Sequence, residues 1–600
     1  MPEIRRISLV LSGGVSLGAY HAGALAEIGY AFALWNAKRD SIEDESLRDS
    51  IPIFHVDVIA GASAGCMTGA MFAEFWSQSR HNPAGFVLKS LATWCDDRLL
   101  VTNLMDPRTC DSSSLLSTSV IDNIASTAFD FRGGVNLPEG QKSLLLRCML
   151  TDVEGREGQV IFFSPSGSAV DLRPKTYGSS ISFVFERSGV SELEFSRQIA
   201  KAPIKKTKLT NGQVATRLKW ATMASGAFPF AWTPIDLMRQ WRDFPAPTGP
   251  NDQDSQLPLY DNWLTRTYTD GGVSNNMPLS LAATAMSSYA EMGGTTFDQA
   301  TLKRTYILLE VSPETNEAVN PAHVSASPGK PGRNLEYTMA KMGMPVFSAA
   351  REQTFFLDLQ RAARINELLA RFDTTFVSMY ASVAKATTEP IELRKRIQAH
   401  VRLNFGRDFL TEEFQRVEEA VLWSYLDHEA LSDLQPDELD LTVTLIAAAL
   451  YGGDLHLKHE MDVFQIKPTR TLSGAFMGAF GGFMSTRFRR EDFRSGIEDA
   501  AHKLTEIYSG LGLERFGLNG FDSAMSMPEV QALEQPKMQT VDGIERPVTR
   551  SFADVDEDTK VDLGDILTER LFTHFWKMHP IKRFFLKPII RGVITNHLKL

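Results

Sequence analysis

The chain has 600 residues, of which 43% are apolar and 22% charged, and its formal net charge is -11. This composition is typical of a globular protein, and the length predicts two or three domains. The acidic balance argues against nucleic acid as the main partner, because binding to a duplex needs a dominant positive surface.

The chain contains few cysteines and no long apolar run. The four cysteines, Cys66, Cys95, Cys110 and Cys148, show no Cys-x-x-Cys spacing. We therefore expect reduced thiols, a cytoplasmic location and no zinc site built on cysteine. No stretch reaches the roughly 18 uninterrupted apolar residues of a membrane-spanning helix, so none is predicted.

The first informative segment is "LVLSGGVSLGAYHAGAL", residues 9–25. A secretion signal is disfavoured because glycines break its apolar run early. A phosphate-binding loop would need Lys and Ser or Thr after Gly18, where Ala19 and Tyr20 stand, and the dinucleotide fingerprint is not matched either. The remaining interpretation is a strand over 7–11 that turns sharply at Gly13 and Gly14 into a helix. Such a turn can direct backbone N–H groups at an oxygen that becomes negative during a reaction.

The second segment is "VDVIAGASAGCMTGAMFAEF", residues 56–75. A short apolar strand leads into Gly61-Ala62-Ser63-Ala64-Gly65, and a helical pattern follows. This is the Gly-x-Ser-x-Gly elbow, in which small residues allow the backbone to bend and present the serine hydroxyl at the start of a helix. Ser63 is the predicted nucleophile.

The third segment is "RTYTDGGVSNNMPLSLAATAM", residues 266–286, in which Asp270 ends a strand and precedes Gly271 and Gly272. A serine hydroxyl is a poor nucleophile until a neighbouring base takes its proton, and Asp270 is a candidate for that base. The structural alternative is an Asp-Gly turn in which the carboxylate bonds its own backbone.

Three segments resemble, in the same order, the motifs of the patatin-like phospholipases. They are Ser12-Gly13-Gly14, Gly61 to Gly65 and Asp270-Gly271-Gly272. The stretch "ATMASGAFPFAWTPI", residues 221–235, resembles the small residues that precede the Asp strand in that family. The resemblance spans about residues 5–315. It implies a three-layer α/β/α core with a mainly parallel sheet, placed at residues 1–320.

The resemblance also implies a mechanism. Asp270 would accept the proton of Ser63 while Ser63 attacks an ester carbonyl and forms an acyl-enzyme. N–H groups of Gly13, Gly14 and Ala64 would form the oxyanion hole, supported by the glycines at 61, 65, 271 and 272. The scheme needs no metal and no cofactor, and its substrate would be a membrane lipid or another acyl ester.

Two residues depart from the family's usual Gly-Gly-Gly-x-Arg/Lys-Gly loop, with Val15 at the third glycine and Leu17 at the basic position. Losing a cation and a flexible position weakens contacts to an oxyanion or phosphate. A catalytically weak or inactive lipid-binding or membrane-docking protein is therefore an alternative. An α/β-hydrolase with the order Ser63, Asp270 and His323 is another, although His323 lies in a Pro/Gly/Ser-rich loop.

Two further histidines, His21 and His55, flank the motifs. We expect both to serve packing or the surface rather than catalysis.

The remaining chain is predicted to be mainly helical. A strand at 305–313 closes the core, the Pro/Gly-rich stretch 321–334 marks a boundary, and helical patterns at 353–373 and 437–450 belong to a region over 335–600. The Gly-broken apolar segment 472–485 is too short to span a bilayer and is expected to form a packed turn rather than a membrane contact.

The C-terminal tail, residues 571–600, has six Lys or Arg residues, no acid and five interleaved large aromatic residues. This pattern predicts peripheral contact with the anionic inner surface of a membrane. The acidic stretch 554–565 offers an alternative partner within the chain.

Overall fold

The computed structural model describes residues 3–570 with internal gaps. The gaps are 107, 111–113, 132, 158–159, 164–168, 173, 194–205, 230, 241–262, 286–303, 313–338, 406–417, 419–420, 423–424, 426–427, 453–460, 517–519, 536–537, 542–543 and 548–549. The described residues fall into two compact units. The first lies within Met1–Ala282, Ile307–Phe355 and Phe464–Leu600, and the second within Ala283–Tyr306 and Phe356–Val463.

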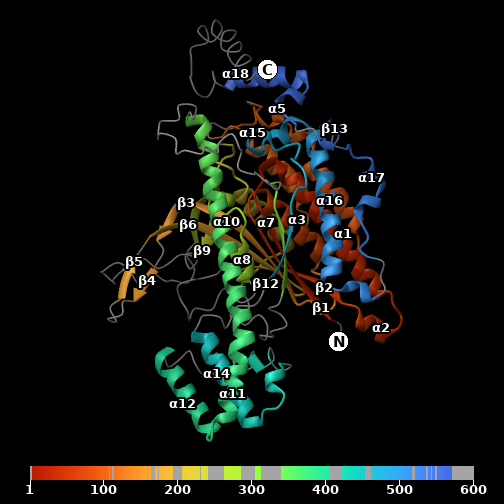
Figure 1. Cartoon of the computed structure of the whole chain (residues 1–600). Helices are drawn as coiled ribbons and strands as arrows, with labels where there is room; N and C mark the ends of the chain where they lie inside the picture. Colours follow the sequence, from red (N-terminus) through yellow and green to blue (C-terminus); the bar gives the residue numbers. More distant parts are fainter. Residues whose placement is uncertain are drawn as a thin grey trace, which may run out of the picture. The chain divides into compact units, whose positions relative to one another are not determined.

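The first unit is built on one large sheet (Figure 1). Its strands are β1 (Ile4–Leu11), β2 (Ile53–Gly61), β3 (Ser143–Glu157), β6 (Lys175–Glu186), β7 (Gly189–Leu193), β8 (Lys206–Lys208), β9 (Ile235–Gln240), β10 (Trp263–Asp270), β11 (Arg304–Leu309) and β12 (Met461–Ile466). Their order is β12-β11-β1-β2-β3-β6-β7-β8, while β10 pairs with both β3 and β9. Two separate hairpins, β4 (Val160–Phe163) with β5 (Ala169–Leu172) and β13 (Met538–Val541) with β14 (Ile544–Pro547), complete the strands.

The centre of the sheet is parallel. β1 pairs with β2 and β2 with β3 in parallel, whereas β6, β7, β8, β9 and β10 join through antiparallel pairings. All nine residues of β2 are buried, as expected of a parallel strand that is covered on both faces. The predicted α/β core is confirmed, and its sheet continues beyond β3 as antiparallel strands.

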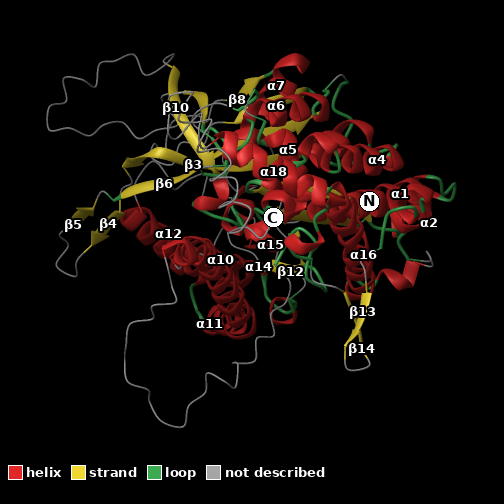
Figure 2. Ribbon diagram, turned by 90° about the horizontal axis from the view of Figure 1, so that it is seen from above, coloured by secondary structure: helices red, strands yellow, loops and turns green. Residues whose placement is uncertain are grey.

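Helices surround this sheet. They are α1 (Gly18–Asp40), α2 (Glu45–Ser50), α3 (Ala64–Glu74), α4 (Pro83–Trp94), α5 (Val101–Leu104), α6 (Thr118–Ala128), α7 (Asn211–Ser225), α8 (Leu279–Ala283), α15 (Phe476–Ala479), α16 (Thr486–Gly510), α17 (Pro528–Gln531) and α18 (Glu557–Arg570). Helices α6 and α7 lie beside each other (Figure 2), and α7 also packs on β3 and β9. Segments far apart in the sequence therefore pack on the same sheet.

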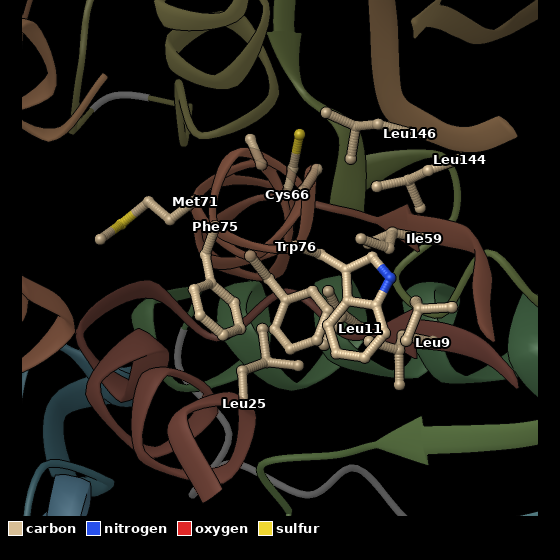
Figure 3. Packing of buried hydrophobic residues seen from close by; sticks show 14 of the residues in the cluster. Leu9, Leu11, Leu25, Ile59, Cys66, Met71, Phe75, Trp76, Leu144 and Leu146 are labelled. Atoms are coloured by element: carbon tan, nitrogen blue, oxygen red, sulfur yellow. The ribbon is translucent and has the colours of Figure 1, made fainter. Parts of the chain in front are cut away.

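A large apolar core holds the central strands and α3 together (Figure 3). Trp76, in the turn that follows α3, lies beside Leu9, Leu11 and Ile59 of β1 and β2, and all four side chains are buried. The Trp76 ring stacks on Phe72 with 5.8 Å between ring centroids. This packing fixes the direction of α3, which carries the predicted nucleophile at its start.

Helix α16 packs against α1, and Figure 1 shows the two helices running side by side. Glycines allow the close approach, because a Cβ atom added at Gly23 would lie 1.9 Å from the carbonyl oxygen of Phe493. A Cβ atom at Gly496 would lie 2.1 Å from the carbonyl oxygen of Tyr20. The described residues after 464 thus belong to the unit of the sheet, a division that differs from the sequence-based boundary at 320–335.

The second unit is mainly helical. It contains the part of α10 (Met339–Arg371) from residue 356 onward, together with α11 (Val377–Ala386), α12 (Pro390–Phe405) and α14 (Pro436–Gly452). Its own apolar core includes buried side chains of α11 and α14. The helices predicted at 353–373 and 437–450 are confirmed by α10, which ends at Arg371, and by α14.

Four predictions concern membrane contact or the domain boundary. Segment 472–485 is described and is buried at both ends, as predicted for a packed turn. No helix of the described chain has the length and apolar character needed to cross a bilayer. The basic tail 571–600 and the boundary stretch 321–334, with His323, lie outside the described residues.

Candidate active site

Ser63 stands at the sharp turn between β2 and α3. Its backbone dihedrals, φ 53° and ψ -128°, are strained for a residue with a side chain. The flanking glycines make the turn fit, because a Cβ atom at Gly61 would lie 2.7 Å from the Gly65 carbonyl oxygen. A Cβ atom at Gly65 would lie 2.4 Å from the carbonyl oxygen of Ser12. Both glycines of the elbow are therefore required by close backbone packing.

Asp270 ends β10 and faces this turn. The Ser63 hydroxyl donates a hydrogen bond of 2.5 Å to Asp270 Oδ2, and both residues are buried. Asp270 Oδ1 accepts a bond of 2.6 Å from the N–H of Gly272. The Asp-Gly turn and the contact with the serine, which the sequence offered as alternatives, thus occur together. Gly271 is needed for packing, since a Cβ atom there would lie 2.0 Å from the Met149 carbonyl oxygen.

Ser225, at the end of α7, is a further polar residue at the site that the sequence analysis assigned no role. Its hydroxyl accepts a 3.0 Å bond from the N–H of Ser63 and donates a 2.7 Å bond to the carbonyl oxygen of Met149. Ser225 is fully buried. It links the strained turn to β3 and so holds the backbone of Ser63 in place. The signal was its position in the small-residue stretch 221–235.

The predicted oxyanion residues differ in their hydrogen bonding. The Gly13 N–H donates to both the carbonyl oxygen and the side-chain oxygen of Asn276, at 3.0 and 3.1 Å. In this state it is not available to an oxyanion, which corrects the expectation for Gly13. Within the described chain, no acceptor is found for the N–H groups of Gly14 and Ala64. Ala64 is the first residue of α3, where the helix dipole favours negative charge.

The two histidines near the motifs take no part in the contact between Ser63 and Asp270. His21 Nε2 lies 3.3 Å from the Ser12 hydroxyl, and His55 Nε2 lies 2.8 Å from the Glu139 carbonyl oxygen. Burial lowers the pKa of each imidazole to about 4, so both are neutral near pH 7. The direct bond from Ser63 to Asp270 leaves no place between them for the imidazole of a triad.

An apolar cavity opens beside Ser63. Its lining residues come from α3, α4, α6, α7, β9 and the loops between them, and include Val15, Ala64, Met67, Thr93, Trp94, Leu99, Thr118, Ile121, Ile124, Met223, Gly226, Ala227, Trp232, Thr233, Ile235 and Phe483. None of these side chains is charged. Such a cavity suits a hydrocarbon chain better than a phosphate group.

Phe483 comes from the C-terminal part of the chain. No local sequence pattern assigned Phe483 to the site.

The strained serine at a strand-to-helix turn, its carboxylate partner and the apolar cavity together define the class of serine hydrolases with an α/β core. Residues 9–283 match the family model described as Patatin-like phospholipase. These residues thus form a domain of the patatin-like phospholipase family, which confirms the resemblance inferred from the motifs. Membership supports hydrolysis of lipid acyl esters in general. No curated protein sequence gives a significant match to the chain.

Proposed function

We propose that the protein is a serine acyl hydrolase that cleaves carboxylic esters of lipids, with Ser63 as nucleophile and Asp270 as its base. The hydrogen bond of 2.5 Å from the Ser63 hydroxyl to Asp270 Oδ2 carries this proposal. A serine and a carboxylate in direct contact need no third residue to move the proton. The match to the patatin-like phospholipases supports the same chemistry.

The reaction proceeds in two halves. Ser63 Oγ attacks the ester carbonyl carbon while Asp270 takes the serine proton, and the alcohol then leaves with that proton as the acyl-enzyme forms. A water molecule next gives a proton to Asp270 and attacks the acyl carbon. The carboxylic acid departs when the Ser63 oxygen regains the proton. All steps use residues of this chain, and the scheme includes no metal or cofactor.

The negative charge that forms on the carbonyl oxygen needs donors. We assign this role to the N–H groups of Gly14 and Ala64, both without an acceptor in the described chain. Gly13 supports the loop through its bonds to Asn276 instead. A lost oxyanion donor typically costs roughly a hundredfold or more in kcat, so these backbone groups would contribute substantially to the rate.

The cavity beside Ser63 would hold the acyl chain. Each methylene group transferred from water into such a site contributes about 0.8 kcal/mol, so a chain of several carbons binds through its tail alone. The sequence also leads us to propose that the protein is cytoplasmic. Residues 571–600 would contact the inner surface of the membrane. This contact would bring the site to its substrate.

The experiment compares the intact protein with Ser63→Ala and Asp270→Asn on a short-chain nitrophenyl ester and on mixed phospholipid vesicles. We expect both variants to lose activity by at least about a thousandfold, since the two residues act as a unit. Ser77→Ala is the matched control, because Ser77 is also buried but bonds the carbonyl oxygen of Glu74. It should retain the wild-type rate.

Labelling by a fluorophosphonate reports on Ser63 without depending on the choice of substrate. The folded wild type should be labelled and Ser63→Ala should not. An unlabelled wild type would favour the alternative of a catalytically weak lipid-binding protein, which Val15 and Leu17 suggested in the sequence. Equal hydrolysis by wild type and Ser63→Ala would contradict the proposed nucleophile.

A further inference from the structure

We propose that residues 472–484, here called the wall segment, form part of the active site, and that Phe483 determines which acyl chains the cavity accepts. This inference rests on the proposed function and adds the selectivity of the same site. Phe483 lines the cavity together with Ser63. It lies far beyond residue 283, where the family match ends. The selectivity of this hydrolase is therefore set partly from outside its family domain.

Hydrogen bonds fix the wall segment to the glycine-rich loop. The Ser16 hydroxyl donates a bond of 2.5 Å to the carbonyl oxygen of Ala479 and accepts one of 3.1 Å from the N–H of Gly482. A Cβ atom at Gly482 would lie 2.7 Å from Ser16 Oγ. The buried hydroxyl of Ser16 is thus satisfied by the wall segment, which ties the position of Phe483 to that of the loop.

A buried arginine fixes the other side of the wall segment. The Arg489 guanidinium donates to the carbonyl oxygens of Gly482, Trp94 and Asp96 at 2.6, 2.9 and 2.8 Å. Trp94 lines the cavity as Phe483 does. One side chain therefore joins two walls of the cavity, because charge-assisted bonds to three carbonyl groups hold both backbones together.

Aromatic contacts set the orientation of the Phe483 ring. Its centroid lies 6.0 Å from that of Trp232, with the rings at 82°, and Phe480 stacks on the same indole at 6.1 Å and 23°. Both arrangements are favoured by the charge distribution of aromatic rings. Trp232 also lines the cavity, so Phe483 is held against another part of its surface.

The two departures from the family loop fit this arrangement. Val15 is buried in an apolar cluster with Phe483 and Met484, and Leu17 in another with Leu472. A basic residue at position 17 would place a charge in this cluster, which is costly without a partner. The loop is therefore apolar where the wall segment covers it.

Truncating Phe483 should enlarge the cavity and favour longer chains. Burial of one additional methylene group is worth about fourfold in kcat/KM from transfer alone. Hydrophobic pockets discriminate between substrates that differ by one methylene group by about 10- to 200-fold. We therefore expect Phe483→Ala to raise the ratio of kcat/KM for a twelve-carbon ester over a six-carbon ester by about tenfold. Phe483→Leu, which keeps an apolar side chain in place, should shift the ratio in the same direction but less.

The test measures that ratio on a series of nitrophenyl esters. Phe521→Ala is the control, because Phe521 is also an aromatic residue of the C-terminal part but packs on Phe32, Trp35 and Phe54. It should keep the wild-type profile. The inference is overturned if folded Phe483→Leu and Phe483→Ala both keep that profile, or if Phe521→Ala changes it equally.

A binding experiment separates this inference from the proposed function. In the Ser63→Ala background, fatty acids of increasing length displace a fluorescent fatty acid without any reaction. When Phe483→Leu or Phe483→Ala is combined with Ser63→Ala, the fatty acid that binds most tightly should be a longer one. This result is expected even if the wild type hydrolyses no ester. A hydrolytically inactive wild type would thus overturn the proposed function alone, whereas an unchanged length preference would overturn the role of Phe483.

Discussion

The bridge made by Ser225 predicts a large effect from a small substitution. Ser225→Ala removes one hydroxyl and leaves two buried groups, the N–H of Ser63 and the carbonyl oxygen of Met149, each without one partner. An unsatisfied buried group costs about 1 to 3 kcal/mol, so two such groups should lower the free energy of unfolding by about 2 to 6 kcal/mol. The backbone of Ser63 also loses a restraint on its strained φ of 53°.

The assay combines urea unfolding with fluorophosphonate labelling of the folded variant. Labelling should slow by about tenfold, which corresponds to about 1.4 kcal/mol in the activation barrier. Thr222→Val is the matched control, because the buried Thr222 hydroxyl donates only to the carbonyl oxygen of Lys219 in its own helix. Its cost should stay near 1 kcal/mol. Equal losses in both variants would refute the reasoning that the bridge holds the backbone of Ser63.

Two other substitutions test the surroundings of the site. Burial lowers the pKa of His21 from 6.5 to about 4, so the unfolded chain binds the proton first and stability is lost as the pH falls through this interval. Between about pH 7 and pH 4, His21→Gln should therefore lose about 3 kcal/mol less of its free energy of unfolding than the wild type, as measured by unfolding at the two pH values. An unchanged pH dependence would contradict a buried neutral imidazole. Gly496→Ala should lower the unfolding free energy by about 3 kcal/mol or more and speed proteolysis within α16, because its Cβ atom would meet the Tyr20 carbonyl oxygen at 2.1 Å. Gly510→Ala in the same helix, where the nearest atom is 3.6 Å away, should change neither measurement, and similar behaviour of the two variants would argue against tight packing of α16 on α1.

The local parts of the candidate site could be predicted from the sequence. The glycines at 61 and 65 mark a turn where any Cβ atom would collide with the backbone, and this requirement is visible in a short stretch of residues. The strand and helix around Ser63 follow from their apolar pattern. The pairing of Ser63 with Asp270 was different, because 207 positions separate them. Only the family resemblance suggested that contact.

The position of α16 could not be predicted because its sequence has the character of an exposed helix. "RFRREDFRSGIEDA" is rich in charge, yet several of its charged side chains are buried. Their charges are satisfied by distant partners, as when Glu491 accepts a 2.7 Å bond from Arg550 and Arg489 donates to carbonyl groups. Charged residues rarely lie inside a protein unless they are paired, and the pairing is a property of the fold.

The glycine-rich loop after β1 likewise depends on partners that are distant in the sequence. Val15 and Leu17 looked like losses when compared with a family whose loop carries glycine and a cation. In the structure both side chains are buried, at 8% and 4% exposure, in clusters that include residues of the wall segment. Whether a residue near an active site is a defect or an adaptation depends on what covers it. The residues that cover this loop lie more than 450 positions later in the chain, at Ala479 and Gly482, so their effect on it could be read only from the fold.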